Sequence, residues 1–252
     1  HGALASEAAL EVMAVLDHMT ASDMAQAYPM MRVRAASRLK ARAHPSPVSA
    51  SGLASNVVKV HKRKQPYTKF FALQEADMSV PRFDGGKEER VYRAGFLGTD
   101  VSIVLPYDPI RDRVLLVEQF RFGPFLRDDP NPWLMEPIAG RVDVGETPEM
   151  AAMREADEEA GLALSALHKV HCGYASPGCS TEYFNTYVGI ADIDDDAAIL
   201  GGLEGEAEDI QGHILSFSDF LSLLKSGQLP VAPLALAGYW LALNRDVLRK
   251  NS

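Results

Sequence analysis

Three glutamates, Glu155, Glu158 and Glu159, combine residue type and spacing in a way that points to chemistry. At three and four residues apart they share one face of a helix, within its last two turns, where the helix dipole disfavours each anion by about 0.3–1 kcal/mol. Arg154 offsets part of that repulsion. A hard divalent cation would reverse it, because Mg²⁺ binds carboxylate oxygens together with the phosphate of a substrate. A solvated helix face is the alternative interpretation, and the spacing alone leaves both open.

The helix that carries these glutamates has clear boundaries in the sequence. Thr147 can cap its first turn, and Gly161 suits the left-handed conformation that ends many helices, so we expect a helix over residues 148–160. Met150 and Met153 lie at helical spacing on another face and are expected to contact the core.

The overall composition is that of an ordinary globular protein. Of 252 residues, 47% are hydrophobic and 23% charged, which excludes a disordered chain, and the net charge of −9 argues against a general nucleic-acid or anionic-membrane surface. Much of the acidity falls in two windows, residues 136–161 and 192–209. The acidic charge is therefore concentrated along the chain.

The sequence contains 2 cysteines, Cys172 and Cys179, too few for a disulfide framework or a four-thiolate zinc site. They favour a reducing compartment. With no signal peptide or membrane span expected, the predicted location is the cytoplasm. Walker A, HExxH and GxSxG patterns do not occur in the sequence, so other common catalytic classes find no support.

The order of the expected elements indicates an α+β fold. Residues 6–42 predict two helices, the second interrupted near Pro29, and residues 43–55 have the proline, serine and glycine content of a linker. Short β-branched and aromatic runs typical of strands follow, then the acidic helix, further strands and two C-terminal helices. We therefore expect a helical N-terminal segment with its linker over residues 1–55 and a larger domain over residues 56–252.

The fixed positions of the acidic segment resemble the Nudix box. Gly140 is followed after five residues by Glu146, after seven more by Arg154-Glu155, and then by Glu158-Glu159 and Gly161-Leu162. The resemblance covers residues 68–243 and looks closest to the ADP-ribose pyrophosphatase branch of nucleoside diphosphatases. It implies an α/β/α sandwich with a mixed sheet, hydrolysis of a nucleoside diphosphate linked to another moiety, and Mg²⁺ held by the box helix, with Mn²⁺ able to substitute.

The resemblance also implies roles for individual residues. Its metal ligands are matched by two carboxylates of the box helix, a backbone carbonyl before it and a carboxylate in a later acidic stretch: Glu155, Glu159, Ala139 and Glu208. In that stretch, GLEGEAEDI, Glu206 resembles the general base. Glu158 resembles a second-line ligand or a residue that positions water. Without the box, the stretch alone would be read as a solvated acidic loop.

A second set of residues resembles the substrate contacts of this branch: Phe70, Phe71, Arg93, Arg121, Arg141, Ser176, Pro177, Gly178 and Glu182. Arg121 resembles the arginine that meets the diphosphate, for which a planar, always-charged guanidinium is suited, although a surface salt bridge is the alternative. Phe70 and Phe71 resemble an aromatic pair that stacks on adenine, and at their position in a strand one of them could instead be core.

The chain departs from the branch at two places. It has Arg93-Ala94 where the branch often has Arg-Glu, and Gly98-Thr99 where the branch has Arg-Gly. These positions touch the base or the terminal ribose in the family, so they bear on the choice of substrate.

The resemblance predicts Mg²⁺-dependent hydrolysis of ADP-ribose to AMP and ribose 5-phosphate. The alternatives are a hydrolase of GDP-mannose or another nucleoside diphosphate sugar and, from a different class, a module that binds a nucleotide sugar without turnover. It further implies a homodimer through the N-terminal strands of residues 57–80, with Phe70 beside the box of the other subunit. Residues 6–42 are similar to the helical tail that precedes the Nudix part in relatives fused to a γ-glutamylcyclotransferase-like domain, which suggests the remainder of such a domain.

Overall fold

The structure of the protein is a computed structural model that describes residues 2–46, 50–195, 200–201 and 209–250. It divides into two compact units. The first consists of His1–Asp100 with Tyr174–Tyr183, and the second of Val101–Gly173 with Phe184–Ser252. The domain boundary expected after residue 55 stays a prediction.

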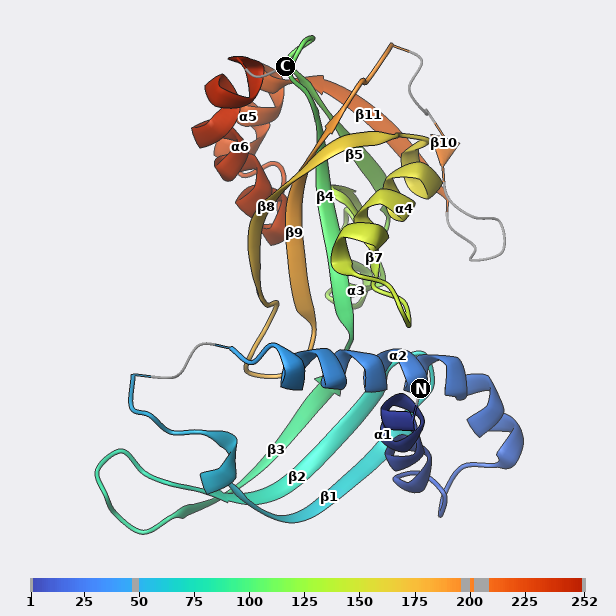
Figure 1. The fold of residues 1–252 in the computed structure, drawn as a ribbon, viewed down its shortest axis with the longest axis vertical. Helices are drawn as coiled ribbons and strands as arrows, with labels where there is room; N and C mark the ends of the chain where they lie inside the picture. The colour runs from blue at the N-terminus through green and yellow to red at the C-terminus, as the bar shows by residue number, and fades with distance from the viewer. Residues whose placement is uncertain (1, 47–49, 196–199, 202–208, 251–252) are drawn as a thin grey trace. The chain divides into compact units, whose positions relative to one another are not determined.

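The first unit combines a helical hairpin with a three-stranded antiparallel sheet (Figure 1). The helices are α1 (Gly2–Met13) and α2 (Ala21–Ala43), and a short 3-10 helix, η1 (Ser55–Val57), precedes the strands β1 (Lys59–Thr68), β2 (Ala72–Val80) and β3 (Glu89–Leu97). β2 lies between β1 and β3. The two helices expected within residues 6–42 are therefore present.

Helix α2 runs without a break through Pro29, so the interruption expected there is wrong. Proline removes one backbone hydrogen bond from a helix. In α2 that loss is outweighed by burial of the following turn, where Met31 and Ala35 are fully buried and Arg34 is 1% exposed. Tertiary packing of one face thus decides the helix, as it does for most helices in globular proteins.

The second unit is built on an eight-stranded sheet within the described residues (Figure 1). Its strands are β4 (Asp100–Asp108), β5 (Arg113–Phe120), β6 (Trp133–Glu136), β7 (Ile138–Arg141), β8 (Leu164–Tyr174), β9 (Tyr183–Ala191), β10 (Leu200–Gly201) and β11 (Ile210–Ser216). The order is β10-β11-β5-β4-β9-β8, with β6 paired to β5 and β7 to β4. The helices are α3 (Phe122–Leu126), α4 (Pro148–Ala160), α5 (Phe217–Lys225) and α6 (Ala232–Lys250).

Helices cover both faces of this sheet, because neighbouring residues of a strand point to opposite faces. On one face, buried strand residues that include Leu105, Leu116 and Val188 pack in one cluster with α5 and α6. Their chain neighbours on the other face, among them Val104, Leu115 and Tyr187, pack with the alanines of α4. The expected α+β class, with helical layers around a mixed sheet, is confirmed.

Pro137 separates β6 from β7 and marks a change of pairing partner. Before it, Glu136 lies opposite Val117 of β5, and after it, Ile138 lies opposite Val104 of β4. Proline cannot donate a ladder hydrogen bond, so it fits the point where one ladder stops and the next begins. This change of pairing partner places Ala139 and Gly140 alongside β4, beneath helix α4.

Among the described residues, none of the helices combines the length and the apolar character needed to cross a bilayer.

The β4–β5 turn is held by Asp112, which has a left-handed φ of 55°. Its carboxylate accepts hydrogen bonds from Arg245 Nε at 2.7 Å and Tyr107 Oη at 2.8 Å, and pairs with Arg249 Nη1 at 2.8 Å. The hydrogen bonds from Arg245 hold the pKa of Asp112 at about 2, below its ordinary value of 3.8. A lowered folded-state pKa adds stability above the unfolded pKa that is lost as pH falls through the folded one.

We therefore expect Asp112→Asn to lower the free energy of unfolding of the second unit by about 2 kcal/mol at pH 7, and this gap to close between about pH 4 and pH 2. Asparagine tolerates the left-handed backbone, so the substitution tests the charge. Urea unfolding from pH 7 to pH 2 measures the gap. Asp246→Asn is the matched control, because Asp246 is exposed and lies 3.6 Å from the same Arg245. A difference in the free energy of unfolding that does not change with pH would contradict the stabilising role given to the Asp112 charge.

Candidate functional site

Helix α4 has the boundaries expected from the sequence, Pro148–Ala160. Thr147 Oγ1 accepts a hydrogen bond from the backbone N–H of Met150 at 3.2 Å. At the other end Gly161 has φ 60°, and the N–H of Leu162 reaches the carbonyl of Ala156 at 2.9 Å, which closes the last turn. Both caps are local, so the chain sequence near each end is sufficient to specify them.

The buried face of α4 is formed by small residues: Ala151, Ala152, Ala156 and Ala160. Met150 and Met153 are 53% and 47% exposed, so the expectation that they contact the core is wrong. Alanine side chains let the helix approach the sheet closely, and methionines in their place would hold it away. The methionines therefore occupy the outer face.

Glu155 lies directly against the backbone of β7. A Cβ atom placed on Gly140 would lie 1.8 Å from Glu155 Oε1 and 2.0 Å from its Cδ, far inside any allowed contact. A side chain at residue 140 would therefore require the Glu155 carboxylate to move. The same close approach brings Glu155 to the strand that contains the carbonyl of Ala139, the expected backbone ligand. Two of the expected metal ligands are therefore held in one small region.

Glu159 is 4% exposed, and Glu158 is partly exposed one position before it on the same helix. A buried carboxylate is costly unless it is paired or binds a metal ion. With Glu146 and Glu155, these side chains bring four carboxylates to one part of α4 and the loop before it. The burial of Glu159 argues against the fully solvated helix face that the sequence left open.

Arg154 connects these acidic groups. Its guanidinium donates to Glu146 Oε1 at 2.9 Å, to Glu155 Oε1 at 2.7 Å and to Glu158 Oε2 at 2.8 Å. Nη2 also donates to the carbonyl of Arg141 at 3.0 Å. The hydrogen bond with Glu146 is the main cause that raises the pKa of Arg154, so its positive charge is secure. Arg154 thus joins three carboxylates, those of Glu146, Glu155 and Glu158, in one ion cluster.

Arg121, the expected diphosphate contact, forms an ion pair with Glu136. Arg121 Nη2 and Nε lie 2.6 Å and 2.7 Å from Glu136 Oε2, and Glu136 is 8% exposed. The salt bridge that was the alternative interpretation of Arg121 is thus observed. Its acidic partner is a buried strand residue, and the Arg121 side chain itself is partly exposed. Sequence reasoning missed Glu136. Its signal is a single carboxylate within the apolar run of residues 133–139.

The two aromatic residues Phe70 and Phe71 belong to the first unit. They lie in the turn between β1 and β2, where Lys69 N donates to the carbonyl of Phe71 at 2.8 Å, so the expectation of a strand position is wrong. Their rings are 49% and 43% exposed, which also excludes the core alternative. The rings meet edge to face at 4.7 Å, and Phe71 lies 4.7 Å from the ring of Phe96.

The segment with Ser176, Pro177 and Gly178 is also in the first unit, bound to the end of β3. Phe96 N donates to the carbonyl of Cys179 at 2.6 Å, and Thr181 N returns to the carbonyl of Phe96 at 3.0 Å. Backbone hydrogen bonds of this kind fix the course of a loop with little dependence on its side chains.

Glu182 packs on Gly98, one of the two positions where the chain departs from the resembled branch. A Cβ on Gly98 would lie 2.2 Å from Glu182 Cγ, so a larger residue is excluded unless Glu182 moves. Burial raises the pKa of Glu182. Arg93, by contrast, is exposed on β3, and its Nη1 donates to the carbonyl of Tyr92 at 3.0 Å.

The remaining expected residues, Glu206 and Glu208, lie outside the described residues. Among the described residues, no group of three or more histidine, cysteine or acidic side chains is arranged as a metal site. The expected ligand set includes Glu208 and a backbone carbonyl, neither of which contributes to such a group.

A family model described as "NUDIX domain" matches residues 97–234. The ADP-ribose pyrophosphatase of Escherichia coli strain K12 is 34% identical over 194 residues, 77% of this chain and 92% of that protein. The GDP-mannose pyrophosphatase of Cronobacter sakazakii is 32% identical over 161 residues, 63% of this chain and 81% of that protein. A solved structure entitled "Crystal structure of ADP compounds hydrolase" shares the fold, with a TM-score of 0.56 at 19% identity over 73% of this chain and 94% of that one.

These matches define the class: the chain belongs to the Nudix family. Within it, the protein is a Nudix pyrophosphohydrolase, with relatives that act on nucleoside diphosphate sugars.

The position of Glu155 against Gly140 predicts how a methyl group added at residue 140 would affect activity. We expect Gly140→Ala to lower kcat for a nucleoside diphosphate sugar by about 100-fold, because the new methyl group displaces the Glu155 carboxylate and a misplacement of about 1 Å in a site can have effects of that size. Gly123→Ala is the matched control, since a Cβ there meets nothing within 4 Å. Circular dichroism checks that both variants fold. Wild-type kcat in Gly140→Ala would show that the position of Glu155 is unimportant.

Proposed function

We propose that this Nudix pyrophosphohydrolase cleaves the diphosphate of ADP-ribose, with Mg²⁺, to AMP and ribose 5-phosphate. The observation that carries the proposal is the Glu155 carboxylate packed on Gly140, on the helix that also bears Glu158 and the buried Glu159. This arrangement serves a reaction at a highly charged substrate, since Mg²⁺ binds a few carboxylates together with the phosphate of a substrate.

The donor set fits a hard divalent ion, which members of this family typically use. Glu155 and Glu159 would hold Mg²⁺ with the carbonyl of Ala139 and with Glu208. All of these ligands are oxygen atoms, as Mg²⁺ prefers, and substrate phosphate would complete the coordination. Mn²⁺ can substitute because it also accepts carboxylate and carbonyl ligands.

The chain's own residues divide the work of hydrolysis. When bound, Mg²⁺ lowers the pKa of water and neutralises charge on the diphosphate. Glu206 takes a proton from the attacking water, whose oxygen bonds to one phosphorus while the bridging P–O bond breaks. Glu158 assists as a second-line ligand or by positioning that water. Arg121 holds the diphosphate, oriented by its ion pair with Glu136.

Base and sugar recognition is assigned to the residues carried over from the resembled branch: Phe70, Phe71, Arg93, Arg141, Ser176, Pro177, Gly178 and Glu182. The exposed aromatic pair supports this for Phe70 and Phe71, because exposed rings are available for stacking. The E. coli relative named ADP-ribose pyrophosphatase favours adenine. GDP-mannose is the second candidate, favoured by the relative of that name, and the departures at Ala94 and Gly98 bear on the choice between the two.

A homodimer through the N-terminal strands and a cytoplasmic location belong to the same proposal. β1 is an end strand of its sheet, and an end strand offers unpaired backbone groups to another chain. The charge and the cysteine content of the sequence support the location.

The substrate assignment is tested by incubating the purified protein with ADP-ribose or GDP-mannose and Mg²⁺. We expect kcat/KM for ADP-ribose to exceed that for GDP-mannose by about tenfold or more, because a pocket suited to one base leaves polar groups of the other unpaired. Chromatography of AMP against GMP measures both reactions, and Glu155→Gln controls for contaminating activity. Preferred release of GMP would replace ADP-ribose by GDP-mannose as the substrate.

Paired variants separate metal binding from proton transfer. We expect Glu206→Gln to lower kcat by about 10²–10⁴-fold, the usual contribution of a general base, while retaining the rise in Tm caused by Mg²⁺. Glu159→Gln should lose both, since it removes a metal ligand. Differential scanning fluorimetry with and without Mg²⁺ measures metal binding as a rise in Tm. AMP release measures kcat. Equal behaviour of the two variants in both assays would refute the division of roles.

A further inference from the structure

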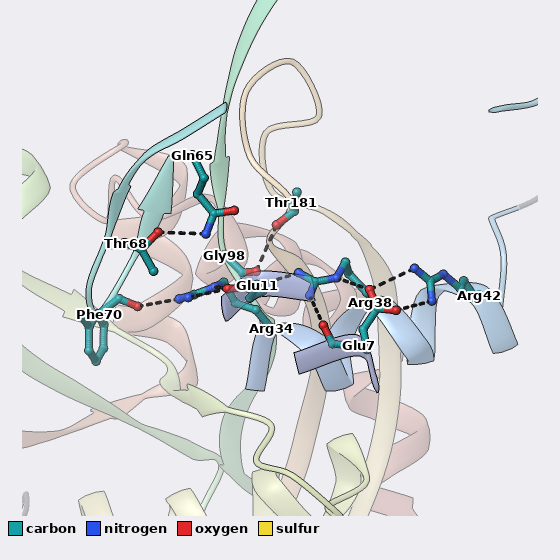
Figure 2. Close-up of polar contacts among 10 residues, drawn as sticks. All are labelled: Glu7, Glu11, Arg34, Arg38, Arg42, Gln65, Thr68, Phe70, Gly98 and Thr181. Carbon is teal, nitrogen blue, oxygen red and sulfur yellow. Dashed lines mark hydrogen bonds and ion pairs between the residues drawn. The ribbon is translucent and has the colours of Figure 1, made fainter. Parts of the chain in front are cut away.

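Helices α1 and α2 are joined by a hairpin ion cluster made of two glutamates of α1 and three arginines of α2: Glu7, Glu11, Arg34, Arg38 and Arg42 (Figure 2). Its inner end is almost completely buried, with Arg34 1% and Glu11 3% exposed. Arg34 Nη2 and Nε donate to Glu11 Oε2 at 2.7 Å and 3.0 Å. Arg38 extends the cluster from Glu11 to Glu7, and Arg42 lies at its exposed end.

Arg34 also donates a hydrogen bond to a residue outside the helical hairpin. Its Nη1 donates to the backbone carbonyl of Phe70 at 3.2 Å (Figure 2). Phe70 lies in the turn that the hydrogen bond from Lys69 N to the carbonyl of Phe71 closes. A planar guanidinium held on one edge by Glu11 presents its other edge in a fixed direction. The backbone that carries the two exposed rings is thus anchored to the helical hairpin.

A second contact anchors the same strand end. His18, between the two helices, has its Nε2 3.0 Å from the carbonyl of Gln65 in β1. Gln65 Nε2 in turn donates to Thr68 Oγ1 at 2.8 Å, and both of these side chains are buried (Figure 2). The hairpin therefore holds the chain at residues 65 and 70, on either side of the end of β1 at Thr68.

Stability alone gives a weak reason for such a cluster. Burying an ion pair costs desolvation energy, and well-packed apolar residues of similar volume often stabilise a protein as well or better. A directed hydrogen bond to one carbonyl is something that apolar residues cannot supply. We take the hairpin ion cluster to position the backbone at Phe70.

We propose that Arg34 is a positioning residue for nucleobase binding: held by Glu11, it fixes the turn of residues 69–71 so that Phe70 and Phe71 present their rings to the base. This rests on the proposed function, in which these rings stack on adenine. It gives the N-terminal helices a role in substrate affinity. The bond-breaking step, which is assigned to residues of the second unit, is unaffected.

The test compares Arg34→Lys with Arg42→Lys. An ammonium cannot pair with Glu11 along one edge and reach Phe70 with the other, whereas Arg42 contacts Glu7 only and its side chain is 61% exposed. Calorimetry measures binding of AMP and of ribose 5-phosphate, and kinetics with ADP-ribose give KM and kcat. We expect Arg34→Lys to raise KM and the Kd of AMP about tenfold, within the range of base stacking on aromatic residues, with kcat and the Kd of ribose 5-phosphate unchanged. Arg42→Lys should change none of them.

Three results would overturn the proposal: equal effects of the two variants, equal weakening of AMP and ribose 5-phosphate, or a fall in kcat alone. If Arg34→Lys fails to fold, His18→Ala decides, because its side chain is 39% exposed and its loss frees the Gln65 carbonyl. It should weaken AMP about threefold and leave ribose 5-phosphate unchanged, and an unchanged Kd of AMP rejects the proposal. A wild-type protein that binds AMP without cleaving ADP-ribose would refute the proposed function and leave the calorimetric comparison decisive.

Discussion

The close approach of helix α4 to strand β7 is the constraint on which the second unit depends. The carboxyl group of Glu155 occupies the space that a Cβ atom on Gly140 would fill, so a larger residue there would displace it. The alanine face of α4 serves the same approach, since larger residues would hold the helix away from the sheet. Pro137 contributes from the other side by ending the pairing with β5, so that β7 can run along β4 under the helix.

This approach gathers negative charge at the less favourable end of a helix. The C-terminal half of α4 carries Glu155, Glu158 and Glu159, where the dipole and mutual repulsion both disfavour anions. Arg154 compensates part of the charge and at the same time ties the loop before the helix to it, through Glu146 and the carbonyl of Arg141. The Mg²⁺ ion proposed for this site would offset the repulsion among these carboxylates. Acidity concentrated in the sequence thus corresponds to acidity concentrated in space for the part of the chain that the structure describes.

The sequence predicted those features that local interactions determine. The ends of α4 follow from Thr147 and Gly161, which act within one turn, and the residue spacing of the box follows from the same helix. Pro29 was misread because burial of Met31 and Arg34, a tertiary effect, holds α2 together across it. Met150 and Met153 were misplaced because helical spacing alone does not say which face meets the sheet. Glu136 was missed because its partner Arg121, 15 residues earlier and just after β5, is brought near it by the pairing of β5 with β6.

The two units carry different kinds of constraint, and this difference bears on how substrate preference can change within the family. The position of the Glu155 carboxylate depends on side-chain packing at Gly140, where an added methyl group would displace it. Of the residues assigned to base and sugar recognition, the aromatic pair and the segment of Ser176–Gly178 lie on a turn and a loop held by backbone carbonyls and amides, at Phe70, Phe96 and Cys179. Backbone contacts persist when side chains change, so such segments can exchange their recognising residues while the fold stays intact. Relatives named for ADP-ribose and for GDP-mannose are 34% and 32% identical to this one chain, which fits recognition segments that vary on a common fold.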